Sequence, residues 1–417
     1  MKKRHSICGS LFLAVLFLFC LPVMVSAAEQ ENKPWEYGKV TGQLRYYYFT
    51  QRDKDKNTTS ETIKESLAIG GFLKYETPWL EETLQGGIAG YTSQPFLSTF
   101  NESGKGGTGL LTSRNDGVTV LGEAYAKLKV QETVGTIFRQ RIETPMVNGN
   151  DSRMIPQTYE AYSLTAKEVD DLTMQLAWIE RVKLRDTDEF KHMSEVSQNS
   201  GLTNSSRGMF MVGGDWSPDA LKTRAWYYHI PDYLRMVFLQ AGSTHPVEED
   251  LFWHWLVQGL DQRNTGASDG GSFNVGELGV LGGLTVSGVR LDIGGTIVDS
   301  TTNVVGRWGV NPFFNNMMSF ANNRAGERTL YLSAAYDFSR MGWKGFDSSV
   351  KTTFADTPES GTNASPDRDE YNLNMNYAFD GDLKGLSIQN RWSYQETKGD
   401  KDGMQVRLRF QYRFQLL

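Results

Sequence analysis

The chain of 417 residues carries a formal net charge of −6 and contains 12% aromatic residues, 42 glycines and two cysteines. The negative charge argues against nucleic acid as a partner, because nucleic-acid-binding proteins gather Lys and Arg to neutralise phosphates. Both cysteines, Cys8 and Cys20, lie near the N-terminus. The rest of the chain therefore has no thiol for a disulfide, a metal site or a cysteine nucleophile.

The N-terminal segment has the composition of a secretory signal peptide. Three positive residues precede the apolar stretch 7–25, and small residues allow cleavage after Ala27 or Ala28. The alternative is a retained membrane anchor, but polar residues follow the small residues directly. We therefore predict a signal peptide at 1–28 and a single exported domain at 29–417. Removing the three positive charges lowers the net charge from −6 to −9.

Beyond the signal there is no run of 18 apolar residues that could form a transmembrane helix. The last stretch, 404–416, instead alternates strictly: every even position is apolar or aromatic, and every odd position is Gln or Arg. Strict alternation predicts a β-strand with two different faces. A soluble strand is typically about 5–6 residues long, whereas about 9–11 tilted residues cross a bilayer. The alternative is a long edge strand of a soluble sandwich.

The same alternation recurs along the chain between two kinds of connection. Short turns alternate with long polar loops at 51–63, 94–116, 185–207, 261–273, 299–328 and 356–369. Long outer loops and short periplasmic turns are typical of outer-membrane barrels. We count eighteen strands: 37–49, 65–76, 84–93, 117–130, 133–142, 157–167, 172–184, 208–217, 221–230, 233–242, 251–260, 274–283, 288–298, 329–339, 346–355, 370–380, 386–397 and 403–416.

These strands predict an all-β fold, a closed antiparallel transmembrane β-barrel in the bacterial outer membrane. An even strand number places both ends in the periplasm, and a barrel of this size encloses a water-filled lumen. Outer-membrane lipid and lipopolysaccharide are then the surrounding partners. The sequence leaves a monomer and a homotrimer equally open.

Basic residues gather on the predicted inner face. They come from strands at the two ends of the chain, which become neighbours when the barrel closes. Arg and Lys lining a pore select anions, and Arg can bind a carboxylate through two hydrogen bonds. The alternative is that these side chains only solvate the lumen and pair with acids such as Glu123. The set comprises Arg45, Lys127, Lys129, Arg139, Arg141, Arg181, Lys183, Arg391, Arg407, Arg409 and Arg413.

One predicted outer loop, 143–156, is short and unusually apolar. Its side chains at 146–147 and 154–155 prefer burial, and the buried place available to an outer loop is the lumen. We therefore predict that it narrows the pore and places Asp151, Ser152 and Arg153 at the constriction. The alternative is a compact surface loop.

Several stretches resemble the OprD-type outer-membrane porins. They are 144–147, 151–159, 164–172, 336–338, 343–346, 383–387 and the pattern Arg407-x-Arg409-x-x-Tyr412. The resemblance covers nearly the whole chain after the signal and is densest at 144–185. It implies an eighteen-stranded channel for small solutes, many with a carboxylate, in which a basic ladder guides the anion to an eyelet.

The resemblance also implies roles for particular residues. The third outer loop (143–156) and the seventh (299–328) would narrow the eyelet. The ladder maps best to Arg45, Arg139, Arg141, Arg391, Arg407 and Arg409. The chain departs from common practice at its end, where Leu417 replaces the aromatic residue that finishes many such barrels.

We accordingly predict passive, substrate-preferring uptake of small anionic or zwitterionic organic solutes, such as carboxylates and amino acids, without cofactor, metal or catalysis. One alternative is a general diffusion porin with weak ion selectivity. Another is a barrel-anchored hydrolase, since 266–270 fits G-x-S-x-G, but that motif needs a strand and a helix around it and no His follows. Asp53-x-Asp55-x-Asn57 begins like a calcium loop but lacks the later ligands, so only a loosely bound cation stays open there.

Overall fold

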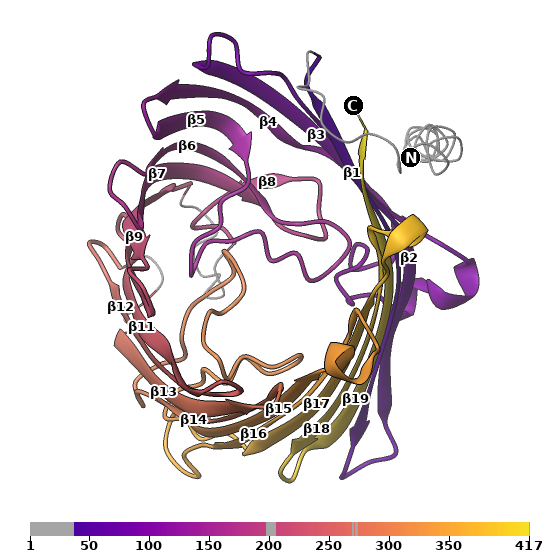
Figure 1. Ribbon diagram of the computed structural model, residues 1–417. Helices are drawn as coiled ribbons and strands as arrows, with labels where there is room; N and C mark the ends of the chain where they lie inside the picture. Colours follow the sequence, from indigo (N-terminus) through magenta and orange to yellow (C-terminus); the bar gives the residue numbers. More distant parts are fainter. Residues whose placement is uncertain (1–36, 197–205, 269–270, 272–273, 417) are drawn as a thin grey trace.

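The computed structural model describes residues 37–196, 206–268, 271 and 274–416, and within them it forms one antiparallel sheet closed on itself (Figure 1). The predicted signal peptide, 1–28, lies outside the described residues. Closure is made by the first and last strands, which pair from Val40–Leu416 to Asp55–Lys401. The predicted fold class is confirmed.

Eighteen strands of the described chain build the barrel wall, as predicted. In chain order they are β1 (Lys39–Asp55), β2 (Glu61–Glu76), β3 (Leu84–Pro95), β4 (Val118–Val130), β5 (Thr133–Gln140), β6 (Thr158–Ala166), β7 (Leu172–Lys183), β9 (Met209–Trp216), β10 (Leu221–Ile230), β11 (Leu234–Glu248), β12 (Leu251–Asn264), β13 (Asn274–Val286), β14 (Val289–Val298), β15 (Arg328–Asp337), β16 (Phe346–Asp356), β17 (Arg368–Ala378), β18 (Leu386–Thr397) and β19 (Lys401–Leu416). The short β8 (Phe190–His192) adds to the end of β7, while β7 pairs directly with β9 in the wall.

Several predicted connections are shorter than expected, and two of them are instructive. The first hairpin continues as strand to Asp55 and resumes at Glu61, inside the predicted loop 51–63. Its sequence there is polar on both faces, because strands that rise above the membrane have no lipid to face, so the alternation signal disappears. Likewise, β11 runs on through an irregularity between Pro246 and Glu248, inside the predicted turn 243–250.

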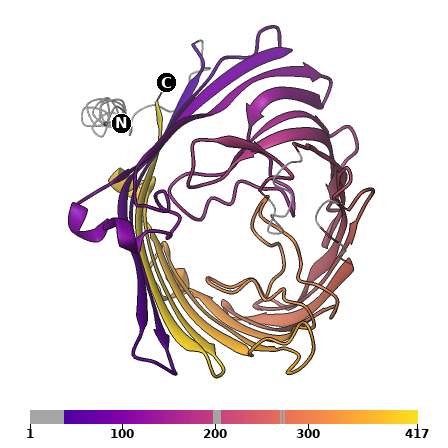
Figure 2. The same ribbon diagram turned by 180° about the vertical axis from the view of Figure 1, so that it is seen from behind.

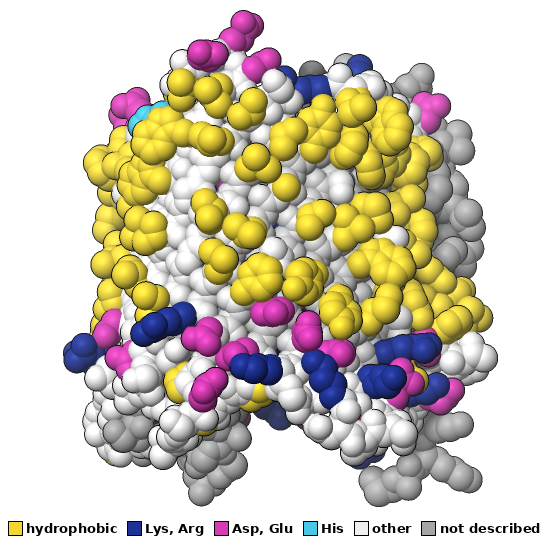
Figure 3. Space-filling model, turned by 90° about the horizontal axis from the view of Figure 1, so that it is seen from below, with side chains coloured by type: hydrophobic (Ala, Val, Ile, Leu, Met, Phe, Trp, Pro, Cys, Tyr) yellow, Lys and Arg dark blue, Asp and Glu magenta, His cyan; other side chains and the backbone are white. Residues whose placement is uncertain are grey.

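The outer face of the wall is apolar. On β13 and β14 the outward side chains include Leu278, Val280 and Ile293, each more than half exposed. Figure 3 shows hydrophobic side chains spread over the wall and a row of charged side chains across it near one end. A polar band next to an apolar one is the arrangement expected at a membrane boundary. None of the helices in the described chain has the length and apolar character needed to cross a membrane.

The inner face is polar and partly filled by loops. Figure 2 shows connections that leave the rim and fold back inside the ring of strands. Their apolar side chains form a cluster against the inner wall, which includes Met146, Trp308 and Phe313. The lumen is therefore narrowed from within, and the question becomes which wall residues remain accessible.

Candidate functional site

Strand register fixes which arginines face the lumen. Arg391 on β18 lies opposite Arg407 on β19, and Arg407 lies opposite Phe49 on β1. Residues opposite each other in a sheet share a face. Two positions along, Arg409 lies opposite Tyr47, with its guanidinium 5.9 Å from the ring centre. Three of the predicted ladder arginines thus lie on one continuous wall.

Arg45, on the same wall, is fully occupied by the loop 143–156. Its two terminal nitrogens donate to both carboxylate oxygens of Asp151 at 2.5 and 2.9 Å, and one also donates to the carbonyl of Arg153 at 2.6 Å. Its Nε donates to Gln411 at 2.8 Å. Arg45 is 2% exposed. Its charge is therefore neutralised, and the residue acts as an anchor that holds the loop inside the lumen.

Arg153 lies beside Arg407 in the narrowed region. Both guanidiniums pack over the Phe49 ring, at 5.1 and 4.9 Å from its centre. Arg153 Nε donates to the Thr108 carbonyl at 2.9 Å. Burial, together with the charges of Arg407 and Arg185, lowers the pKa of Arg153 well below its usual value. Arginine nevertheless stays charged in proteins, so Arg153 adds its charge to those of Arg407 and Arg185 in this region.

Arg407 keeps an unused donor. One terminal nitrogen donates to the Met318 carbonyl at 2.9 Å, but its buried Nε has no hydrogen-bond partner among the residues that the structure describes. Arg391, opposite, donates through Nε to Asn374 at 2.6 Å. A buried, charged donor without a partner costs free energy.

A cavity of about 590 Å³ opens beside these residues. Arg153, Arg185, Arg307, Arg391 and Arg407 line it, and Asp186 is the one acidic residue among its described lining residues. A second cavity of about 420 Å³ shares Arg153, Arg185 and Arg407 with the first. These three shared arginines lie where the two cavities meet. Together with Arg391, which lines the first cavity, we call them the eyelet arginines: Arg153, Arg185, Arg391 and Arg407.

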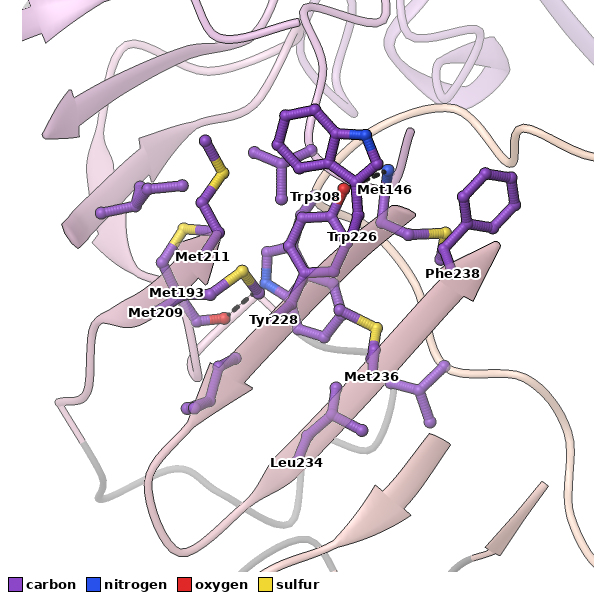
Figure 4. Close-up of a cluster of buried hydrophobic side chains, with 14 of the residues drawn as sticks. Met146, Met193, Met209, Met211, Trp226, Tyr228, Leu234, Met236, Phe238 and Trp308 are labelled. Atoms are coloured by element: carbon purple, nitrogen blue, oxygen red, sulfur yellow. Dashed lines mark hydrogen bonds between the residues drawn. The ribbon is translucent and has the colours of Figure 1, made fainter. Parts of the chain in front are cut away.

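The third and seventh outer loops are clamped to each other. Asn148 accepts from Val310 N at 2.9 Å, and its own N donates to the Trp308 carbonyl at 3.2 Å. Gln157 donates to the Arg307 carbonyl at 3.0 Å. Trp308 is fully buried and donates to the Met193 carbonyl at 2.7 Å. Figure 4 shows its ring among methionines from several segments.

The far end of the seventh loop is held by the opposite wall. The carboxylate of Glu370, on β17, accepts from the backbone of Ser319 and Phe320 at 3.0 and 2.8 Å. Asn315 donates to Thr296 on β14 at 2.7 Å. The loop therefore crosses the lumen with fixed supports on both sides, which gives the eyelet a defined shape.

Arg139 is a correction to the predicted ladder. It lies opposite Glu160 on β6 and forms an ion pair with it at 3.0 Å. Its Nη1 donates to the carbonyl of Leu121, whose side chain is exposed on the outer face. Arg139 therefore faces outward. In the predicted strand 133–142 apolar residues fall on both faces, so the alternation could not decide the orientation.

Arg181 is a second predicted inward residue that faces outward, and the cause is different. It faces outward with Glu160 because a bulge between Glu160 and Ala161 shifts the register of β6 against β7. A bulge adds one residue to a strand, so beyond it the inward-facing positions change from odd to even numbers or the reverse. By contrast, Lys183 is buried and donates to the Pro156 carbonyl at 2.7 Å, as a further support of the third loop.

The remaining predicted site residues each have a polar partner in the structure. Arg141 follows the end of β5 and pairs with Glu143 at the base of the third loop, at 2.9 Å. Arg413 donates to Gln43 at 3.1 Å on the inner wall. Ser152 accepts from Arg185 at 2.9 Å. Asp151, Ser152 and Arg153 all lie inside the barrel, but the Asp151 carboxylate is occupied by Arg45.

Sequence reasoning did not single out Arg185, Glu370 or the second outer loop. Arg185 is the first residue of the predicted polar loop 185–207. Glu370 is the first residue of the predicted strand 370–380 and occupies one of its inward-facing positions. That position could have indicated a role inside the lumen. Leu110 and Leu111 of the second loop are buried against the inner wall. An isolated pair of apolar residues in a Gly-rich stretch could have indicated that this loop folds inward.

The residues that prompted the hydrolase alternative form a plain turn as far as they are described. Ser268 has a left-handed backbone, φ 55°, and hydrogen-bonds Asn264, while Asp269 and Gly270 lie outside the described residues. Asp55 accepts from the backbone of Asn57 and Thr58. In the part of the chain that the structure describes, no three His, Asp or Glu residues are placed to hold a metal ion.

Comparisons with known proteins agree with this geometry. The family described as outer membrane porin, OprD family, matches residues 35–416. Pseudomonas aeruginosa OccK9 (OpdG) has 21% identity and a TM-score of 0.83, covering 91% of this chain and 98% of that chain. P. aeruginosa OpdK with vanillate has 19% identity and a TM-score of 0.80, covering 91% and 99%. Acinetobacter baumannii OccAB3 has 18% identity and a TM-score of 0.80, with the same coverage. Among curated protein sequences, no significant match is found.

A closed barrel with an apolar outer face and a lumen narrowed by its own loops defines an outer-membrane channel. The chain belongs to the OprD family of outer membrane porins. At these identities the structural likeness shows the shared barrel fold, so the solute must be argued from the eyelet itself.

Proposed function

We propose that this porin passes small organic anions, with carboxylates as the preferred class, and that the eyelet arginines provide the preference. The observation that carries the proposal is the charge imbalance in the cavity of about 590 Å³, whose described lining residues include five arginines and one acidic residue. The excess positive charge lies in a narrow space bounded by protein, where fields are stronger than in bulk water. It would raise the local concentration of anions.

The geometry favours a carboxylate over a simple halide. Arg407 and Arg391 lie directly opposite each other on neighbouring strands, and both line the cavity. Two guanidiniums on one wall can hold both oxygens of a planar carboxylate. Asn150 and Ser152 line the same cavity and offer neutral polar groups for the rest of the solute. Zwitterions such as amino acids fit less completely, because Asp186 is the acidic residue available to their ammonium group.

A related observation on a similar protein points the same way. One of the matching solved structures is of OpdK with vanillate, a small aromatic carboxylate. We do not transfer that molecule to this chain; the proposal concerns the carboxylate as a chemical class. The two clamped loops would limit solute size, because they fill the lumen from fixed supports on opposite walls.

Single-channel recording in a planar bilayer tests the proposal. Adding benzoate should reduce the current carried by chloride, because the carboxylate occupies the eyelet, whereas the neutral benzamide should leave the current unchanged. In Arg407→Ala the block by benzoate should weaken. Equal effects of benzoate and benzamide, or no effect of either together with a large conductance, would instead indicate a general diffusion pore.

A further inference from the structure

The connection after β3 begins on the outside of the barrel. Residues 96–101, which include the 3-10 turn η1 (Ser98–Phe100), form a short segment that we call the outer strap. It lies outside the wall beside β2 in both Figure 1 and Figure 2. The ring of Phe96 packs edge-on against Tyr46, with centroids 5.4 Å apart, and that of Phe100 packs against Tyr48 at 5.6 Å.

The two tyrosines establish which side the strap occupies. Tyr47 and Phe49 face the lumen, where they contact Arg409 and Arg407. Tyr46 and Tyr48 alternate with them on β1 and so point to the outer face. Tyr46 also packs against Phe410, an outward residue of β19, at 6.1 Å. The strap therefore covers the lipid-facing side of β1.

The strap is held firmly to the wall. Phe96 N donates to the Leu67 carbonyl at 2.9 Å. Asn101 accepts from Leu67 N at 2.9 Å and donates to the Leu67 and Leu97 carbonyls at 2.9 and 2.8 Å. One asparagine thus satisfies both backbone groups of a strand residue and closes the strap on itself. Such bonding fixes the position of the strap's outward side chains.

The exposed side chains of the strap are two apolar ones, Phe96 and Leu97, followed by two hydroxyl side chains, Ser98 and Thr99. Phe96 is 38% exposed and Leu97 is 55% exposed. Leu97 has a left-handed backbone, φ 62°, a conformation that residues other than glycine rarely adopt and that costs free energy. A strained leucine that points away from the protein gains nothing in water, but it gains transfer free energy in hydrocarbon.

We propose that the outer strap is a lipid-binding site that inserts Phe96 and Leu97 among the acyl chains of the outer leaflet. The inference uses the outer-membrane location and does not depend on which solute the pore carries. A second copy of the chain is a poorer occupant, because a stable protein interface buries about 800 Å² per partner, and the strap offers two exposed apolar side chains. Acyl chains need no such area, since they already surround the wall.

The same connection also reaches the eyelet. After the strap it turns into the lumen, where Thr108 accepts from Arg153 Nε at 2.9 Å and Leu110 is fully buried. Ser66 on β2 hydrogen-bonds the Thr108 hydroxyl at 2.6 Å. One end of this loop is therefore attached to the lipid side of the wall, and the other supports an eyelet arginine.

Site-directed spin labelling tests the lipid contact, and the chain suits it because residues 29–417 contain no cysteine. Leu97→Cys carries the label in the folded porin in phosphatidylcholine vesicles. Ile293→Cys, outward on β14 and 59% exposed, is the lipid control, and Thr58→Cys, in the exposed first outer turn, is the water control. Relaxation by oxygen, which dissolves in lipid, is compared with relaxation by a water-soluble nickel complex.

The label at residue 97 should respond to oxygen more than to nickel, as at residue 293. A nickel-dominated response like that at residue 58 would overturn the proposal. Protection from both reagents would overturn it too, and would indicate that protein, such as a second copy, covers the strap. Phe96→Cys provides a second reading of the same contact if Leu97→Cys does not fold, because that side chain also points outward beside Tyr46.

Discussion

Arg45 and Arg407 lie on the same inner wall, on neighbouring strands, and both are almost completely buried. Arg45 forms a two-pronged ion pair with Asp151 and holds the third loop. Arg407 lines a cavity rich in arginine, and its Nε has no hydrogen-bond partner in the described part of the chain. The same residue type on the same wall thus anchors a loop at one level and, in the proposed function, offers a binding charge at another. The difference is the presence of an acidic partner.

The largest effect is expected from the clamp between the loops. Trp308→Ala removes a fully buried ring and its bond to Met193, which should cost about 3–5 kcal/mol of stability. The seventh loop should then move, and single-channel conductance should rise and become noisier. Trp253→Ala, which removes an outward ring on β12 that is 42% exposed, is the matched control. Equal effects in the two variants would show that the ring does not act through the loop.

Arg45→Ala should come next. It leaves the Asp151 carboxylate without its partner, and the cost should be about 3 kcal/mol, the low end for breaking a buried pair, because Asp151 is 24% exposed and can reach water. Chemical denaturation of the folded barrel measures this. Conductance should rise as the third loop loosens. The double variant Arg45→Ala/Asp151→Ala should recover part of the stability, whereas strictly additive losses would argue against the anchor.

Arg407→Ala distinguishes an arginine that binds the solute from one that anchors a loop. Stability should change less than in Arg45→Ala, while carboxylate block should weaken by about ten- to a hundredfold, since a hydrogen bond to a charged group contributes about 1.5–3 kcal/mol. The concentration of benzoate that halves the current measures this. Arg407→Lys should retain part of the block because the charge remains. A block unchanged in both variants would remove Arg407 from the solute path.

The smallest effect is expected on the outer face. Arg139→Ala breaks an ion pair with Glu160 that is partly exposed, and such pairs contribute about 0–1 kcal/mol. Anion preference should be unchanged, because the guanidinium does not face the lumen. The reversal potential of the variant provides the measurement. A clear loss of anion preference would mean that Arg139 reaches the pore after all.

The sequence predicts the fold well because a lipid-facing strand must alternate without interruption, as β19 does. The orientation of arginines follows equally well on strands with strict alternation. It fails for Arg139, whose strand has apolar residues on both faces, and for Arg181, which follows a bulge. Both errors arise where the period of two no longer determines the face of the sheet.

The roles of the inward arginines are a different matter. The sequence correctly predicts that Arg45 points inward. Its partner Asp151, however, is 106 residues away and belongs to a loop, so no local pattern could show that the charge is neutralised. The roles of Arg185 and Glu370 likewise depend on contacts between segments that are distant in the sequence. The apolar character of 143–156 was the exception, because burial leaves a compositional signal even in a loop.

The most direct test of the central claim is the reversal potential across a gradient of potassium chloride, compared between the unchanged porin and Arg407→Ala in the same bilayer. If the eyelet arginines select anions, the reversal potential should have the sign expected for a chloride-selective pore. In Arg407→Ala the potential should shift toward zero, whereas in Arg139→Ala it should not. A potential set by potassium, or an identical value in the porin and Arg407→Ala, would contradict the account.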